Sequence, residues 1–163
     1  MVEVEVYEIS IAKATSTPII FLKQKEGTNK RVLPIWIGGP EAVAIQSQLV
    51  KDMAPPRPMT HDLMKNIIES LDAKVVSICV HSMKEDTFFG RVTLETGGES
   101  IEIDSRPSDA IALALRFSAP LYVAEEVISA NGISEEELER SEKQQPKESA
   151  ENLTEDRLRR YTV

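Results

Sequence analysis

Two short segments hold most of the side chains in this sequence that could act together chemically. Residues 57–62 read Arg-Pro-Met-Thr-His-Asp, and residues 104–109 read Asp-Ser-Arg-Pro-Ser-Asp. Arginine offers a planar fork of donors to phosphate oxygens, and Mg²⁺ needs only one or two protein carboxylates when substrate phosphates supply its other ligands. A metal ion with an arginine clamp is sufficient for phosphodiester hydrolysis. Both segments also lie at the N-termini of predicted helices, which favour an anion.

Each of these residues has an ordinary structural explanation as well. Asp62 and Asp109 lie in the first turns of predicted helices, where the helix dipole favours a carboxylate without any function. Asp104 is equally suited to capping a helix or to pairing with Arg106. His61 next to a helix start could be an ordinary surface histidine, and the two arginines could join the segments through ion pairs. The functional hypothesis therefore requires the two segments to meet in space.

Composition limits the classes of partner. The 163-residue chain carries a formal net charge of −8, and it has no basic stripe of the kind that gives non-specific nucleic-acid binding. Contact with a polyanion would depend on a few local arginines, or on metal ions held by carboxylates. Cys79 is the only cysteine, which excludes an internal disulfide and a zinc site of several cysteines. Its apolar strand context predicts a small buried side chain.

The sequence gives no sign of a membrane partner. No apolar run approaches the roughly 18 residues that a membrane crossing needs. The first six residues alternate acidic and apolar types, whereas a signal peptide begins with basic ones. We therefore expect a cytoplasmic protein with no membrane partner.

Strands and helices must position the two segments. Alternation of apolar residues predicts strands at residues 2–7, 18–23, 31–37, 76–80, 88–94, 100–103 and 121–123. Apolar residues at helical spacing predict helices at residues 42–53, 60–71, 107–119 and 134–143. Thr60 is the expected N-cap of the second helix, and Ser134 with Glu137 forms a capping box for the last. The third helix is apolar nearly all round, which predicts that it is buried.

One pattern of strand, break and helix occurs twice. Residues 35–37 and residues 101–103 each read Ile-x-Ile, and each is followed by a break with proline, an acidic residue and a helix. The pattern predicts an α+β fold in which a three-strand-plus-helix unit is duplicated, with mixed or antiparallel sheets around a buried central helix. The first corner, glycine-rich, is expected to be chemically bare. The polar second corner therefore indicates the site.

The repeat also suggests where the folded domain ends. We expect one domain over residues 1–133 and a charged C-terminal helix with a mobile tail over residues 134–163. Apolar residues become sparse beyond residue 146, and a marginal helix is predicted around residues 153–161.

Four motifs are informative beyond their chemistry. They are Leu33-Pro34-Ile35-Trp36-Ile37-Gly38, Glu41-Ala42, Arg57-Pro58-Met59-Thr60-His61-Asp62-Leu63 and Asp104-Ser105-Arg106-Pro107-Ser108-Asp109-Ala110-Ile111-Ala112-Leu113. With these motifs, the chain from about Val2 to Ile133 resembles the bifunctional nuclease domain family. The resemblance implies an α+β duplication, DNase and RNase activity, and a homodimer or higher homo-oligomer.

The leading hypothesis is a metal-assisted nuclease that acts on DNA or RNA. Asp104 and Asp109 would hold Mg²⁺ or Mn²⁺. The other candidate catalytic residues are His61 and Asp62, either of which could help to hold the ion. His61 could instead be a general base or acid. The candidate substrate-binding residues are Arg57, Thr60, Arg106 and Ser108.

Two alternatives stay open. In the first, the chain is a non-catalytic dimeric binding protein whose polar segments only fix helix starts. In the second, it is a sensor of small molecules or anions. An outward-facing Trp36 would indicate a protein–protein surface, whereas an inward-facing one would pack in the core.

Overall fold

The computed structural model describes residues 1–12, 15–28, 30–50, 53, 55–144 and 148–149. Its described strands form one sheet in the order β6-β5-β4-β7-β1-β2-β3-β8, with β9 beside β1. Among these strands, β4 and β7 are the one parallel pair, and all other neighbours are antiparallel. The strand bounds are β1 Val2–Ala12, β2 Thr17–Gln24, β3 Arg31–Trp36, β4 Ala73–Lys84, β5 Thr87–Thr96, β6 Glu99–Ser105, β7 Leu121–Val123, β8 Ile133–Ser134 and β9 Glu148–Ser149.

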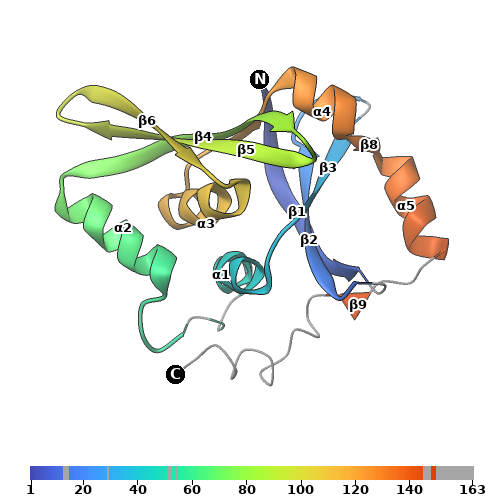
Figure 1. Ribbon diagram of the computed structural model, residues 1–163, viewed down its shortest axis with the longest axis horizontal. Helices are drawn as coiled ribbons and strands as arrows, with labels where there is room; N and C mark the ends of the chain where they lie inside the picture. Colours follow the sequence, from blue (N-terminus) through green and yellow to red (C-terminus); the bar gives the residue numbers. More distant parts are fainter. Residues whose placement is uncertain (13–14, 29, 51–52, 54, 145–147, 150–163) are drawn as a thin grey trace.

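The helices α1, α2 and α3 lie together on one side of the half of the sheet formed by β4, β5 and β6 (Figure 1). α3 contacts β4, β5, α1 and α2. α4 contacts β3 and β4, and α5 contacts β3 and β8. The helix bounds are α1 Gly39–Leu49, α2 Thr60–Ser70, α3 Pro107–Phe117, α4 Glu125–Asn131 and α5 Glu135–Gln144. This arrangement brings the starts of α1, α2 and α3 to one region.

The core lies between the sheet and these helices, and the sequence pattern accounts for it. In β1, Val2 and Val4 are buried while Glu3 and Glu5 are exposed, as period-two alternation requires. α3 begins with Pro107, whose missing N–H costs nothing in the first turn. The largest fully buried side chains are Ile20, Leu22, Leu33, Ile45, Ile78, Ile111, Ile128, Val4, Val32, Val80 and Val123.

The structure confirms the α+β class, and every strand and helix predicted up to residue 144 is present, several with shifted ends. The capping box at the last helix is confirmed, since Glu137 Oε2 accepts from Ser134 N at 2.8 Å and Glu137 N donates to Ser134 Oγ at 3.2 Å. α4, β8 and β9 were not predicted. The chain order of three strands and a helix occurs twice, while the duplication, the central helix and the domain boundary at residue 133 stay predictions.

Other predictions have mixed outcomes. Cys79 is buried, and burial raises the pKa of its thiol, as expected of a small core residue. The predicted helix at residues 153–161 lies outside the described residues, as does most of the predicted tail. None of the helices in the described ranges has the length and apolar character that a membrane crossing requires.

Gly90 explains how closely the start of α3 approaches the sheet. A Cβ atom at this β5 position would lie 3.0 Å from the carbonyl oxygen of Ser105 and 3.1 Å from both Cα and N of Pro107. These are backbone atoms, so they can yield only if the β6–α3 corner moves. Glycine is therefore required here for a close approach.

We predict that Gly90→Ala lowers the free energy of unfolding by about 1–3 kcal/mol, as overpacking does elsewhere. Urea denaturation measures the change, with Thr93→Ala on the same strand as the control. A Gly→Ala change that fits its site instead stabilises a protein by about 0.4–1 kcal/mol. Such a gain would show that the corner has room for a side chain.

Candidate functional site

The two polar segments meet, as the functional hypothesis requires. His61 is the second residue of α2 and Asp109 the third of α3, and His61 Nε2 lies 3.1 Å from Asp109 Oδ1. His61 is buried, with 10% of its side chain exposed. An ionised carboxylate only accepts hydrogen bonds, so a neutral His61 must carry its proton on Nε2. The lone pair then belongs to Nδ1, which makes no hydrogen bond to any residue that the structure describes.

Arg106 completes this contact from the start of α3. Its Nε donates to Asp109 Oδ2 at 2.6 Å and its Nη2 donates to Asp109 Oδ1 at 3.0 Å. Nη2 also lies 2.8 Å from Glu41 Oε1. Two carboxylates thus orient the guanidinium, while 66% of the Arg106 side chain stays exposed. Its Nη1 has no partner within the described ranges, so it remains able to donate.

Glu41 corrects the expectation that the first strand-to-helix corner is chemically bare. It lies in the first turn of α1, and its carboxylate reaches across to Arg106. Gly38 makes room for it, since a Cβ atom there would collide with Glu41 Oε2. The acidic residues after both breaks, Glu41 and Asp109, therefore bind the same arginine. The repeat in the sequence contained this signal, but its first copy was not recognised as part of a site.

Asp62 and Arg116 form a second contact between α2 and α3. Arg116 Nε donates to Asp62 Oδ1 at 2.6 Å, and Asp62 Oδ2 accepts from Met59 N at 2.8 Å. The prediction of Thr60 as the N-cap is wrong, because Met59 is the N-cap and Asp62 satisfies its N–H from inside the helix. Sequence analysis missed Arg116, which follows an apolar run and gave no local sign of burial.

Hydrogen bonds from neighbouring groups keep the carboxyl groups of Asp62 and Asp109 ionised. Burial raises the pKa of Asp109, but hydrogen bonds from Arg106 and His61 outweigh burial, so that pKa lies below its ordinary value. Burial likewise raises the pKa of Asp62, and hydrogen bonds from Met59 and Arg116 reverse that effect. Both groups are therefore negative at neutral pH and act as acceptors.

The remaining predicted residues lie around this cluster. Arg57 and Thr60 are exposed just before and at the start of α2, and Ser108 is buried in α3. Asp104 is an exposed residue of β6 that pairs in register with Arg91. Among the residues that the structure describes, no group of three or more His, Cys, Asp or Glu side chains could hold a metal ion. Joint binding of a metal by Asp104 and Asp109 stays a prediction.

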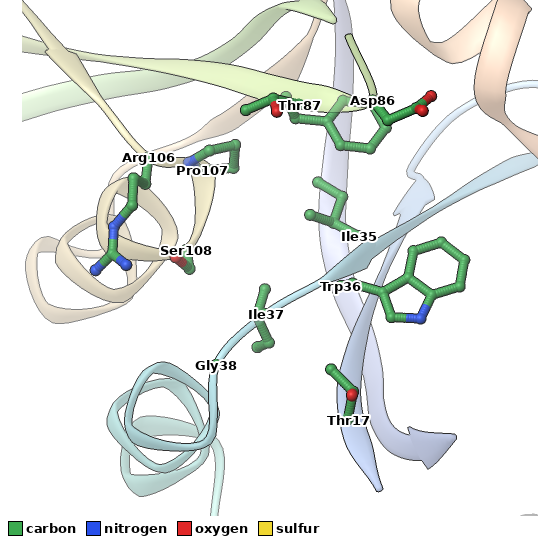
Figure 2. Close-up of a pocket in the computed structure, with 11 residues that line it drawn as sticks. Thr17, Ile35, Trp36, Ile37, Gly38, Asp86, Thr87, Arg106, Pro107 and Ser108 are labelled. Atoms are coloured by element: carbon green, nitrogen blue, oxygen red, sulfur yellow. The ribbon is translucent and has the colours of Figure 1, made fainter. Parts of the chain in front are cut away.

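A pocket of about 410 Å³ adjoins the cluster, between the end of β3 and the start of α3. Figure 2 shows Ile35 of β3 and Ile37, just after this strand, on the side that faces Pro107 and Ser108. Arg106 belongs to both the pocket and the His61–Asp109 cluster. The Trp36 indole points to the other side of the strand and is 60% exposed. A protein–protein contact at Trp36 stays a prediction.

Comparison with known proteins gives one consistent family. The family model described as Bifunctional nuclease domain matches residues 20–136. An uncharacterized protein of Mycobacterium tuberculosis is 35% identical over 133 residues, covering 82% of this chain and 77% of the relative. Bifunctional nuclease 1 of Oryza sativa subsp. japonica is 28% identical over 117 residues, 70% of this chain but 35% of that protein. Bifunctional nuclease 1 of Arabidopsis thaliana is 26% identical over 119 residues, which cover 71% of this chain and 36% of that protein.

The Asp62–Arg116 contact predicts a pH dependence of stability. Asp62→Asn should lower the free energy of unfolding by about 3 kcal/mol at pH 7, because it leaves a buried arginine without its counter-charge. The pKa of Asp62 is lower in the folded chain than in the unfolded one. Its contribution is therefore complete above the unfolded value near 3.9 and is lost as pH falls through the folded value.

Urea denaturation between pH 7 and pH 2.5 measures this dependence. The difference between the wild type and Asp62→Asn should be constant down to about pH 4 and shrink below it. Asp72→Asn is the control, because Asp72 is exposed at φ 53°, a conformation that both residues tolerate. An equal difference at all pH values would contradict the ion pair.

Proposed function

The chain belongs to the bifunctional nuclease domain family, and on this basis we propose that it is a nuclease that hydrolyses phosphodiester bonds of DNA, RNA or both. The observation that carries the proposal is the His61–Asp109 contact beside Arg106. Nucleases named in the comparisons are similar to this chain over about 70% of its length. The geometry supports the proposal because it brings a histidine, a carboxylate and an arginine into contact at one place.

In the proposed reaction, His61 is the general base. Asp109 accepts a hydrogen bond from Nε2–H and so keeps the lone pair on Nδ1, the role that a carboxylate has beside histidine in hydrolytic triads. Nδ1 takes a proton from the attacking water or hydroxyl group as that oxygen bonds to phosphorus. The phosphorus–oxygen bond to the departing sugar breaks, and the sugar oxygen takes up a proton from the imidazolium, which Asp109 stabilises until then. The proposal requires the exposed 10% of the side chain to include Nδ1, so that this atom reaches the proton directly or through one water.

Arg106 holds the phosphate in this proposal. Its orientation is set by Asp109 and Glu41, and its Nη1 is directed at neither carboxylate. A pre-oriented guanidinium loses little side-chain entropy when it binds a phosphate oxygen. The adjoining pocket then receives the neighbouring part of the substrate, with Ser108 in its wall. Arg57 and Thr60, exposed near the start of α2, would contact phosphates farther along the strand.

A divalent ion, Mg²⁺ or Mn²⁺, remains part of the proposal with a restriction. The donors on the chain do not make a ready site, because both oxygens of Asp109 already accept from Arg106 or His61. The exposed Asp104 could serve as a single carboxylate ligand for an ion that substrate phosphates hold. The steps above therefore involve only the chain's own residues.

We predict that His61→Gln lowers the rate of cleavage about 10²–10⁴-fold, the usual contribution of a general base. His81→Gln changes the other histidine of the chain and should leave the rate unchanged. Highly purified proteins are assayed on single- and double-stranded DNA and RNA with Mg²⁺ or Mn²⁺. Equal activity in the wild type and His61→Gln would identify a contaminant and remove the nuclease proposal.

The same assay in EDTA tests the metal. Loss of activity with recovery in Mn²⁺ supports the ion, whereas full activity in EDTA shows that it is not required. The rival hypothesis is a non-catalytic binding protein, which the capping and ion-pair roles of Asp62 and Asp109 support. It expects no cleavage under any of these conditions, together with a loss of thermal stability in Arg106→Ala.

We also propose a homodimer through the outer face of α2. An apolar stripe on this helix and its C-cap faces solvent in the single chain, although its helical spacing is typical of a buried face. The stripe consists of Leu63, Met64, Ile67 and Leu71. The uncovered edge strand β6 adds Ile101 and Ile103, which are in register with Leu94 and the buried Val92 and so share their face of the sheet. Exposed apolar side chains gathered on a helix and on an edge strand usually mark an interface.

We predict that the double variant Ile67→Glu/Leu71→Glu is monomeric, because two charges would be buried without partners. Size-exclusion chromatography with light scattering gives the mass at several concentrations. Asn66→Glu, at an exposed position of the same helix, should remain dimeric. A wild type that is monomeric throughout would exclude this interface.

A further inference from the structure

Arg116, at the end of α3, has a place in the fold that stability alone explains poorly. Its side chain is 2% exposed, and an arginine cannot lose its charge in a protein. Nη1 donates to the backbone oxygens of Ala44 and Ala112, both at 2.9 Å. Nη2 is buried and has no hydrogen-bond partner among the described residues. Burying a charge with an unsatisfied N–H costs free energy that an apolar side chain of similar length would avoid.

The contacts of Arg116 join three helices. Ala112 belongs to α3 itself, Ala44 to α1, and Asp62, which Nε contacts at 2.6 Å, to α2. Asp62 is bound on both of its oxygens, because Oδ2 accepts from Met59 N. The first turn of α2, from its N-cap to its third residue, is therefore fixed relative to α1 and α3.

His61 lies inside this fixed turn. α2 is attached to α3 at two places seven residues apart on α3, through His61 to Asp109 and through Asp62 to Arg116. Seven residues are close to two helical turns, or about 10.5 Å along the axis. Two attachments at that separation restrict rotation of the start of α2 relative to α3. A single hydrogen bond from a histidine would not restrict this rotation.

We propose that Arg116 is a positioning residue, which acts through Asp62 to hold the His61 imidazole on Asp109 with its lone pair on Nδ1. The proposal rests on the proposed function for its effect on catalysis. The effect of Arg116 on the orientation and tautomer of His61 is independent of the proposed function, because the tautomer can be measured in a protein with no activity at all. Arg116 touches neither the substrate nor the reacting atoms in this scheme.

The test uses the two histidines of the chain, His61 and His81. In the ¹⁵N-labelled full chain, two-bond ¹H–¹⁵N spectra report which ring nitrogen carries the proton, and His81→Gln assigns the signals. The wild type should show the Nε2–H form of His61. Arg116→Met keeps the length of the side chain but removes the contact to Asp62, so a mixture of the two tautomers is expected.

Kinetics give the second readout. Arg116→Met should lower kcat by about tenfold or more with KM within about twofold, because misplacing a catalytic group by about 1 Å costs up to about a hundredfold. If Arg116 acts through Asp62, the Arg116→Met/Asp62→Asn double variant loses no more than Arg116→Met alone. Arg116→Lys, which can still donate to Asp62, should restore part of the wild-type tautomer signal and part of kcat.

A matched control separates positioning from stability. Ile128→Ala removes fully buried side-chain volume in α4 and should lower the melting temperature while leaving the His61 tautomer and kcat unchanged. Arg116→Met with a wild-type His61 spectrum would overturn the proposal, whatever its stability. If Arg116→Met does not fold, Arg116→Lys and Asp62→Asn decide by the same spectrum. An inactive wild type whose His61 tautomer depends on Arg116 would refute the nuclease proposal and keep the positioning role.

Discussion

The placement of the start of α2 against α3 is the constraint on which the candidate site depends. Two carboxylates establish it, one on each helix. Asp62 of α2 binds Arg116 of α3, and Asp109 of α3 binds His61 of α2, so each helix supplies one acceptor to the other. Both carboxylates also bind N–H groups near their own helix start. Each helix terminus is thus stabilised by the same group that fixes its neighbour, and the site is as rigid as the packing of the two helices.

The charge of the cluster limits how it can meet a polyanion. Glu41 and Asp109 place two negative charges around the one positive charge of Arg106, in a chain whose net charge is already −8. A phosphodiester would therefore gain little from long-range attraction and would rely on short contacts to Arg106 Nη1 and to the exposed Arg57. This balance is the strongest physical argument for a divalent ion that arrives with the substrate.

Local patterns predicted the elements, but not which surfaces they cover. Alternation and helical spacing were sufficient for the strands and for α1, α2, α3 and α5, because those signals arise within a few residues. The apolar face of α2 was evident, yet nothing local shows that Leu71 would stay 69% exposed. Arg116 is the clearest failure. Its partners Asp62 and Ala44 are 54 and 72 residues away, so its burial is a property of the tertiary structure. Glu41 was recoverable, since the repeat aligned it with Asp109.

The hypothesis of a non-catalytic binding protein, whose polar segments only fix helix starts, and the catalytic hypothesis explain the same ion pairs, so those pairs cannot decide between them. The difference lies in the donors and acceptors left over. Fixing the helix starts needs only the contacts of Asp62 and Asp109. It gives no reason why, among the described residues, His61 Nδ1 and the neighbouring Arg106 Nη1 both lack a hydrogen-bond partner. A general base beside a phosphate-binding group requires both features at once. Asp109 accounts for both features, because it accepts a hydrogen bond from Nε2–H and orients Arg106. In the proposed reaction, the carboxylate that stabilises the helix start is therefore also the one that prepares the base and the phosphate-binding group.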